Sequence, residues 1–391
     1  MHDNTGWGLI STGEAFATSV SLNSLVLGRN GWLLSLDLVT STFYNVTGYC
    51  NRLHMTRSKP SSVTIRDVAR QAKVSVATVS RYINRAAPVS PEVAARVQAA
   101  MADLKFVPHA SAQRLATHKT NALGLLVGSL HDFFSPMFTG IEGVTNAAGF
   151  DLLISSSHKK ELPLTLGPHN TDGLLVFWDS LSQASLRHAY EQAFPMVLIH
   201  QSPPEGLAIP CVTVENQEAS KRLVDHLIEA HGRRRIVFLR GPADNEDSCR
   251  RESGYRQALD AHGLPFDPRL LAAGDYDRAV AEASISRLLK ARVEFDAVFA
   301  ADDDTAVGVL AALRAAGRQV PEEVSVAGFD DQGMSAYVTP PLTTVRAPTE
   351  EVGRQAAQQL VNLVRRKPAE PLILLPTELV IRQSCGCARE G

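Results

Sequence analysis

Acidic side chains follow two apolar runs in the second half of the chain, where strands are predicted to end. Asp302 and Asp303 come directly after Ala297–Ala300, and Asp330 comes shortly after Val324–Gly328. The carboxyl ends of parallel strands share one edge of a sheet, and open α/β sheets bind their ligands there. The three carboxylates therefore predict a cleft for a small ligand. A cation site is the alternative for the run 302–304, although one of its aspartates is better placed to N-cap the following helix.

A histidine and four aromatic side chains are further candidates for the same cleft. His200 directly follows another apolar run, Met196–Ile199. The rings on which the apolar face of a ligand could stack are those of Phe133, Phe134, Trp178 and Tyr276. The alternative for the two phenylalanines is an ordinary place in the core.

The cysteines are odd in number and scattered over the chain, which indicates reduced thiols and no disulfide framework. Cys385 and Cys387 form a C-x-C pair that could be half of a metal site. No second Cys/His pair with zinc-like spacing accompanies it, so neither a metal nor another cofactor is expected. The sequence motifs of nucleophile elbows, Walker loops, dinucleotide-binding turns and H-E-x-x-H metalloproteases are missing as well, so an enzyme is not expected.

Charge is distributed unevenly along the 391 residues, although the net charge is only −2. The stretch Met55–Thr120 contains eleven Lys or Arg and three acidic residues. A basic block on an acidic body points to a nucleic-acid-binding module, and a solvated basic face is the alternative. Gly31–Val39, the longest apolar stretch near the start, is too short to span a bilayer and makes a poor signal peptide. A cytoplasmic protein is therefore expected.

The basic block has the apolar spacing of helices and predicts a helix-turn-helix. Thr64 is placed to cap its first helix and Ser75 its second, and Ser90-Pro91 starts a third. The side chains that the second helix can present to DNA are Val76, Ala77, Thr78, Ser80, Arg81 and Asn84. Thr64 and Ser75 are expected to contact DNA as well. Lys73 stands in the turn, where glycine would suit a left-handed backbone. A small helical bundle without DNA binding is the alternative.

From Asn121 onward, short apolar runs alternate with helical stretches, which is typical of parallel sheets covered on both faces. Strands are expected at 122–128, 152–155, 173–177, 196–199, 212–214, 235–239, 297–300 and 324–328. Helices are expected between most of them, including 218–230, 253–262, 279–291, 304–316 and 349–366. This region is too long for one sheet, so two α/β lobes with a cleft between them are expected.

The chain resembles the lactose-repressor (LacI/GalR) family of bacterial transcription regulators. The matching stretches are VTIRDVARQAKVSVATVSRYIN, PVSPEVAARVQAAMADLKFVPHASAQRLA, FLRGP with RRESGYRQAL, VFAADDDTAVGVLAAL, VSVAGFDD and PPLTTVRAP. They occur in family order, with roughly family spacing, from about Val63 to Cys385.

The resemblance implies a homodimeric DNA-binding repressor whose body has the periplasmic-binding-protein fold and binds a sugar-like effector between two lobes. It implies a hinge helix over 109–115, in which His109, Ala112 and Leu115 meet the minor groove of an operator. Leu115 would be the wedge at a central CpG step, because pyrimidine–purine steps kink easily. The resemblance also brings Arg251 to the effector, where a guanidinium could bind vicinal hydroxyls or a carboxylate.

The expected domains are a poorly ordered extension (1–54), a helix-turn-helix (55–106), a hinge (107–120), a two-lobed effector and dimerisation domain (121–385) and a tail (386–391). An upstream start codon would explain the extension, and a small extra domain is the alternative for it. One departure from the family is the segment between Ser157 and Asp172, which is too short and too rich in Pro and Gly for the usual crossover helix. A cytosolic solute-binding sensor without specific DNA binding is the alternative function.

Overall fold

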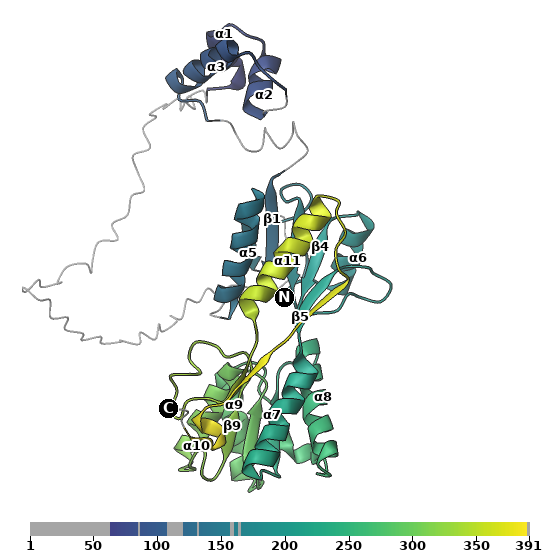
Figure 1. Ribbon diagram of the computed structural model, residues 1–391, viewed down its shortest axis with the longest axis vertical. Coiled ribbons are helices and arrows are strands. Elements are labelled where there is room, and N and C mark those ends of the chain that lie inside the picture. The colour runs from purple at the N-terminus through teal and green to yellow at the C-terminus, as the bar shows by residue number, and fades with distance from the viewer. Residues whose placement is uncertain are drawn as a thin grey trace, which may run out of the picture. The chain divides into compact units, whose positions relative to one another are not determined.

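The computed structural model describes residues 63–84, 87–107, 120–130, 133–156, 160–162 and 166–388. The expected extension over 1–54 lies outside the described residues, as do the expected hinge residues His109, Ala112 and Leu115. The described part consists of a helical head and an α/β body of two lobes (Figure 1).

The head is the predicted helix-turn-helix followed by a third helix: α1 (Ile65–Ala72), α2 (Val76–Asn84) and α3 (Pro91–Asp103). Its small core contains Val68 and Val79, both fully buried, and Val97 from α3. The backbone N–H and hydroxyl of Thr64 both donate to the Asp67 carboxylate, at 3.0 and 2.7 Å, which fixes the start of α1.

The N-terminal lobe is a parallel six-stranded sheet in the order β11-β5-β4-β3-β1-β2. Its strands are β1 (Ala122–Val127), β2 (Asp151–Ser156), β3 (Gly173–Phe177), β4 (Met196–Ile199), β5 (Cys211–Val214) and β11 (Leu372–Leu375). Its helices are α5 (Phe134–Ala148), α6 (Gln183–Glu191) and α11 (Thr349–Val364). Strand residues alternate between two cores: Leu125 packs with α5 and α11, whereas Leu126 packs with α6.

The C-terminal lobe is a parallel four-stranded sheet in the order β7-β6-β8-β9. Its strands are β6 (Ile236–Arg240), β7 (Leu271–Ala273), β8 (Ala297–Ala300) and β9 (Ser325–Ala327). Its helices are α7 (Asn216–His231), α8 (Glu246–Ala261), α9 (Arg278–Lys290) and α10 (Asp303–Ala315), with 3-10 turns at Pro268–Leu270 and Gln383–Cys385. Phe238 packs with α7 and α8 on one face, and Val237 packs with α9 and α10 on the other.

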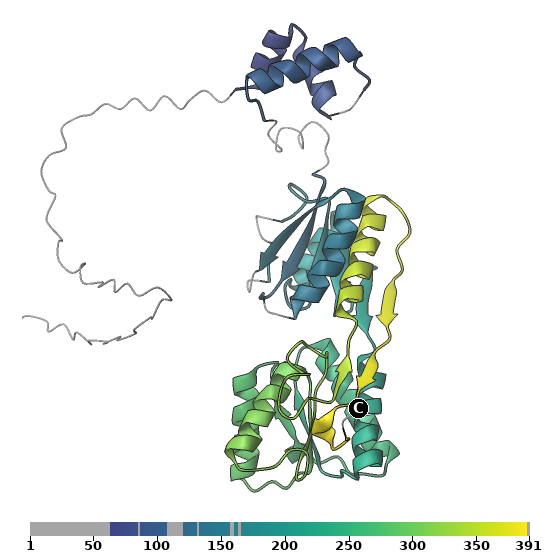
Figure 2. The same ribbon diagram turned by 60° about the vertical axis from the view of Figure 1, so that its left-hand side comes forward.

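The chain passes between the lobes after β5, after β10 (Thr344–Arg346) and again before β12 (Glu378–Val380). β10 and β12 pair antiparallel and form a two-stranded ribbon between the lobes (Figure 2). Because α11 and β11 return to the N-terminal lobe, each lobe is assembled from segments that are far apart in the sequence.

Helices α5 and α11 lie side by side on the N-terminal lobe and contact each other through two glycines (Figure 1). A Cβ atom on Gly140 would lie 2.0 Å from the backbone oxygen of Glu350, and one on Gly353 would lie 2.2 Å from that of Met137. Both distances are far below van der Waals contact, so the two backbones approach as closely as only glycine permits.

The segment between β2 and β3 forms no helix in its described part, residues 160–162 and 166–172, as the sequence predicted. Leu166, which is almost fully buried, covers part of the sheet there. β2 is left as a partly exposed edge strand, and Ile154 in it is 44% exposed. No helix within the described residues is long and apolar enough to cross a membrane.

Candidate functional site

A cavity of about 440 Å³ is lined by residues of both lobes. The predicted ligand residues that line it are Phe133, Phe134, Trp178, His200, Arg251, Tyr276, Asp302 and Asp330. They come from the ends of strands and the starts of helices, which is the position expected for a ligand site in open α/β sheets.

Asp303 is the exception, because it does not belong to the wall of the cavity. Its buried carboxylate accepts hydrogen bonds from the Ser335 hydroxyl, from Thr344 Oγ1 at 2.6 Å and from the Gln332 backbone at 2.8 Å. Burial raises the pKa of Asp303 well above its usual value, although the Ser335 and Thr344 hydrogen bonds oppose this. The residue holds the loop after β9 in place and does not line the cavity, so that it contacts a ligand stays a prediction without support from this geometry.

Arg251, on α8, joins three segments through its guanidinium and is almost fully buried. Its Nε donates to Asn216 Oδ1 at 2.8 Å, and its Nη1 donates to the Ala301 backbone oxygen. Its Nη2 donates to Asp330 Oδ1 at 3.2 Å, and its Cζ lies 3.7 Å from the centre of the Phe329 ring. Arg251 therefore fixes the Asp330 carboxylate in the wall of the cavity.

His200 presents an unsatisfied nitrogen in the cavity wall. Its Nδ1 lies 2.7 Å from Asp247 Oδ2, and Thr213 Oγ1 donates to the other Asp247 oxygen at 3.2 Å. Its Nε2 is buried and has no hydrogen-bond partner among the described residues. With Asp247 ionised, Nδ1–H is the donor of that pair, so Nε2 is the ring nitrogen left to bond a ligand.

Aromatic rings pack around His200 on one side of the cavity. The Phe133 and Phe177 ring centres lie 6.2 and 5.6 Å from that of His200, and Phe134 packs edge-on against Phe177 at 4.8 Å. Trp178 also lines the cavity. The wall therefore combines aromatic surface with carboxylates, a composition suited to a ligand that has both apolar faces and hydroxyl groups.

The buried carboxylates of the cavity differ in their acidity. Burial and the charge of Asp330 raise the pKa of Asp302 to about 7, although hydrogen bonds from Thr305 oppose this. Burial also raises the pKa of Asp330, against the effect of Arg251. Burial acts on Asp247 in the same way, but the neighbouring His200 and Arg251 outweigh it and lower its pKa. Asp302 also serves as the N-cap of α10, accepting from the Thr305 backbone at 2.9 Å.

Backbone strain is concentrated around the cavity. Five lining residues other than glycine have left-handed backbones: Asp179, His200, Asp275, Tyr276 and Asp330, with φ values between 52° and 98°. Such conformations are costly for residues with a Cβ and persist where the surrounding structure enforces them, often at ligand sites.

Several lining residues were not predicted from the sequence, among them Asn245, Asp247, Asp275 and Gln332. The first two lie at the start of α8, which begins at Glu246 and not at Ser253 as predicted. Asn245 is the N-cap and accepts from the Ser248 backbone at 2.7 Å. An Asn followed by two acidic residues is an N-terminal helix signal, and it would have placed both residues at the cleft.

The head presents the predicted DNA-facing residues on α2. Ser75 caps this helix by accepting from the Thr78 backbone at 3.1 Å, and Lys73 adopts the expected left-handed conformation with φ 52°. Ser75, Val76, Ala77 and Arg81 are exposed, and Thr78, Ser80 and Asn84 are half-buried. Val79, Tyr82 and Ile83 pack inward.

The C-x-C pair lies beside two histidines that were not predicted to accompany it. His226 and His231 are on α7, more than 150 residues before Cys385 and Cys387, and their ligand atoms and the two sulfur atoms all lie within 4.8 Å of one another. The expectation that no second Cys/His pair with zinc-like spacing accompanies the two cysteines is therefore wrong, because His226 and His231 have H-x₄-H spacing and lie beside them.

A helix-turn-helix head and a two-lobed body with a ligand-sized cavity define a ligand-responsive DNA-binding protein. Residues 64–109 match the family model for bacterial regulatory proteins of the lacI family, and residues 224–385 match that for a periplasmic binding protein-like domain. CelR of Thermobifida fusca is 33% identical over 82% of this chain and 98% of its own length. GalR of Escherichia coli is 34% identical over 82% of this chain and 94% of its own.

Solved structures of bacterial regulators are similar to this chain as well. A CelR–cellobiose complex matches with 30% identity and a TM-score of 0.60 over 82% of this chain and 99% of that one. The lac repressor dimer bound to operator and an anti-inducer matches with 26% identity and a TM-score of 0.73 over 83% and 99%. The chain belongs to the LacI family of bacterial regulatory proteins. It is a DNA-binding transcriptional regulator with a periplasmic-binding-protein-like effector domain, and not an enzyme.

Proposed function

We propose that this regulator represses transcription by binding a pseudopalindromic operator as a homodimer, under the control of a sugar-like effector in the cavity between its lobes. The observation that carries the proposal is the buried, unsatisfied Nε2 of His200 in a cavity whose wall also holds carboxylates and aromatic rings. A polar ligand would satisfy this nitrogen, and an unpaired buried group is otherwise costly.

On the DNA side, α2 would enter the major groove with Arg81 reaching a guanine edge and Val76 and Ala77 approaching thymine methyl groups. His109, Ala112 and Leu115 would form the minor-groove contacts, with Leu115 inserted at a central CpG step. Two heads of a dimer would read two half-sites, which is why a pseudopalindrome is expected.

On the effector side, Asp302 and Asp330 would accept hydrogen bonds from hydroxyl groups, and Asp302 in its protonated form would donate one. Arg251 would hold Asp330 in position, and Trp178 with the Phe133–Phe177 wall would cover the apolar face of a sugar ring. Cellobiose in the similar CelR complex supports a sugar as the ligand class.

Effector binding would act through closure of the two lobes around the ligand. Closure changes the segments that cross between the lobes, and in a dimer this would order or release the paired hinge helices. Binding of the effector and binding of the operator would then be coupled, because both depend on whether the paired hinge helices are ordered.

The DNA-binding part is tested by selecting random duplex DNA with the full chain at low and moderate salt. We expect enrichment of a pseudopalindrome with a central CpG, and loss of the CpG preference in Leu115→Ala. Binding that is sequence-independent and strongly salt-sensitive would support the alternative of a solute-binding sensor without a specific DNA site.

The effector part is tested by calorimetric titration with cellobiose and a panel of mono- and disaccharides, with nucleosides as a second ligand class. The sugar that binds is expected to bind His200→Leu about tenfold more weakly or worse, because leucine has no hydrogen-bonding atom in place of Nε2. His188→Leu is the matched control, since His188 is exposed on α6. Equal affinity in both variants, or binding of nucleosides alone, would contradict the proposal.

A further inference from the structure

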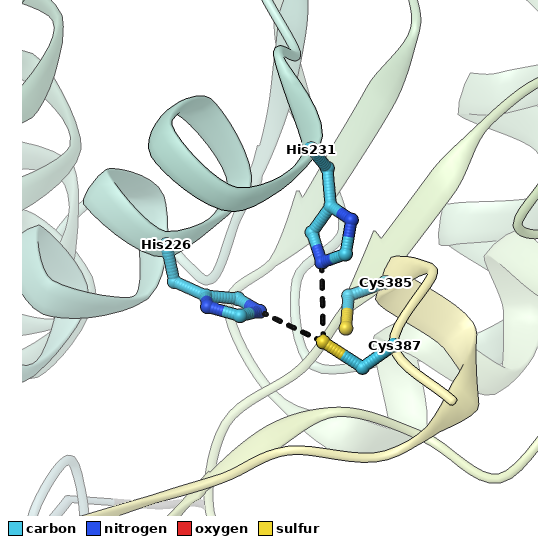
Figure 3. Close-up of side chains that lie close together, drawn as sticks. All are labelled: His226, His231, Cys385 and Cys387. Carbon is cyan, nitrogen blue, oxygen red and sulfur yellow. Dashed lines mark hydrogen bonds between the residues drawn. The ribbon is translucent and has the colours of Figure 1, made fainter. Parts of the chain in front are cut away.

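Four side chains with metal-binding atoms meet on the C-terminal lobe, away from the residues that line the cavity (Figure 3). His226 and His231 lie in the last two turns of α7, and Cys385 and Cys387 lie at the end of the 3-10 turn Gln383–Cys385. Both imidazole Nε2 atoms point toward the Cys387 sulfur, and the Cys385 sulfur lies beside it (Figure 3). The fold thus brings together two residue pairs that the sequence separates by more than 150 positions.

The spacing of these atoms is close to that of a tetrahedral zinc site. Zn–S bonds of about 2.3 Å and Zn–N bonds of about 2.0–2.1 Å give tetrahedral edges of about 3.4 to 3.8 Å. Cys387 Sγ lies 3.3 Å from His231 Nε2 and 3.8 Å from His226 Nε2. All four ligand atoms lie within 4.8 Å of one another, so side-chain adjustments of an ångström or less would complete the coordination.

The backbone around the cysteines is held firmly in place. The Ser384 hydroxyl donates to the Val326 backbone oxygen at 2.6 Å and accepts from the Thr343 backbone at 2.8 Å. The Ser325 hydroxyl donates to the Cys385 backbone oxygen at 2.6 Å. The end of the chain is therefore fixed to β9 before any metal binds, so that the sulfur atoms are presented by a preformed turn.

Gly386, between the two cysteines, lets this turn approach α7. Its backbone is left-handed with φ 115°, and a Cβ there would lie 2.9 Å from His231 Nδ1. Any other residue would be strained and would push against the His231 ring. The sequence C-G-C is thus the one that brings both sulfur atoms to the histidines.

We propose that His226, His231, Cys385 and Cys387 bind one zinc ion per chain in a closed Cys₂His₂ site. Two thiolates and two imidazoles in a tetrahedral arrangement favour zinc over harder cations, and four protein ligands leave no position for catalysis. Binding would release the two thiol protons to solvent. The ion would tie the end of the chain to α7 and stabilise the C-terminal lobe, independently of operator and effector binding. This replaces the expectation, drawn from the sequence, that the chain binds no metal.

The first test is the metal content of the full chain, purified under reducing conditions without metal affinity or chelators, by plasma mass spectrometry. We expect one zinc per chain. After removal of zinc, added Co²⁺ should give an absorption spectrum with thiolate charge-transfer bands and the d–d bands of a tetrahedral ion, which zinc itself does not have. Less than a tenth of an equivalent of zinc together with no such Co²⁺ spectrum would overturn the proposal.

Variants then assign the ligands. Cys387→Ser and His226→Gln each remove a half-buried ligand and should weaken zinc binding at least tenfold, measured by competition with a chromogenic chelator. Cys249→Ser is the matched control, because Cys249 is exposed on α8 and should leave the affinity unchanged. Wild-type affinity in the double variant Cys387→Ser/His226→Gln would place the zinc elsewhere and contradict the assignment.

Thermal unfolding distinguishes a bound metal ion from a pair of cysteines that binds none. Chelation should lower the Tm of the wild-type chain and leave that of Cys387→Ser unchanged. A disulfide between Cys385 and Cys387 in the reduced preparation, found by mass mapping of peptides, would instead show that the pair is a redox couple and would overturn the zinc site.

Discussion

Asp302 serves both as the N-cap of α10 and as part of the cavity wall. Its pKa of about 7, against 3.8 for an exposed aspartate, means that the native state binds its proton more tightly than the unfolded state does. The stabilisation that comes with this proton is fully present below pH 3.8 and is lost as the pH rises through 7. The residue is therefore a source of pH dependence within the physiological range.

We predict that Asp302→Asn becomes progressively more stable relative to wild type as the pH rises from 5 to 8. Asparagine keeps the N-cap acceptor and has no charge to bury, and the change in relative stability should be of the order of 2 kcal/mol. Urea denaturation at several pH values measures it. Asp304→Asn, on the same turn with a side chain 37% exposed, is the control and should show a much flatter difference. Parallel pH profiles for wild type and Asp302→Asn would contradict the raised pKa.

At the level of secondary structure elements, the contact between α5 and α11 depends on two glycines. We predict that Gly140→Ala destabilises the protein by about 1–3 kcal/mol or more, because its Cβ would meet the backbone of Glu350, which cannot move aside as a flexible side chain could. Gly143→Ala is the matched control on the same helix, since nothing lies within 4 Å of its Cβ. This control should be stabilising by roughly 0.5–1 kcal/mol, through the helix propensity of alanine.

Chemical denaturation of both variants measures the difference. If Gly140→Ala proved as stable as Gly143→Ala, the two helices would have to be able to separate at little cost. The close approach of α5 and α11 would then not be a fixed property of the lobe.

The sequence predicted strands well wherever they are short, apolar and buried on both faces. The predictions for β3, β4 and β8 agree with the structure to the residue, and α9 and α10 are shifted by a single position. The antiparallel ribbon of β10 and β12 was missed, because both strands are three residues long and their pairing joins distant segments. The start of α8 was missed because its first turns are charged and polar, so the apolar period begins only later.

The cavity-lining residues that follow strands could be predicted from the sequence. His200, Asp302 and Asp330 follow β4, β8 and β9, and all three line the cavity. Asp303 does not line the cavity as Asp302 does, because neighbouring residues at a helix start point in different directions, and the sequence does not show which of them faces the ligand site. The partners of the two cysteines were missed although His226 and His231 have zinc-like H-x₄-H spacing, because this pair is a long way back in the sequence and only the fold brings it close.

At the scale of the whole molecule, operator and effector are expected to influence each other through the lobes. We predict that the bound effector changes operator affinity by a factor of about 5–150, and that operator changes effector affinity by the same factor. Trp178 provides the signal: in a full chain with Trp7→Phe and Trp32→Phe it is the only tryptophan, and it lines the cavity. Its fluorescence can follow effector titration with and without operator DNA. A factor of one in both directions would show that the two sites are independent.

The repeated crossing between the lobes also determines the order in which the protein can fold during its synthesis. β5 leaves the ribosome early, but its neighbour in the sheet, β11, is nearly the last strand to be made. At about 5–20 residues per second, translation of the segment between them takes roughly 8 to 30 s. The C-terminal lobe can begin to fold in that interval, whereas the N-terminal sheet keeps an open edge at β5. An unpaired apolar strand edge is prone to aggregation, so the nascent chain should need a chaperone most while residues 215–371 are being translated.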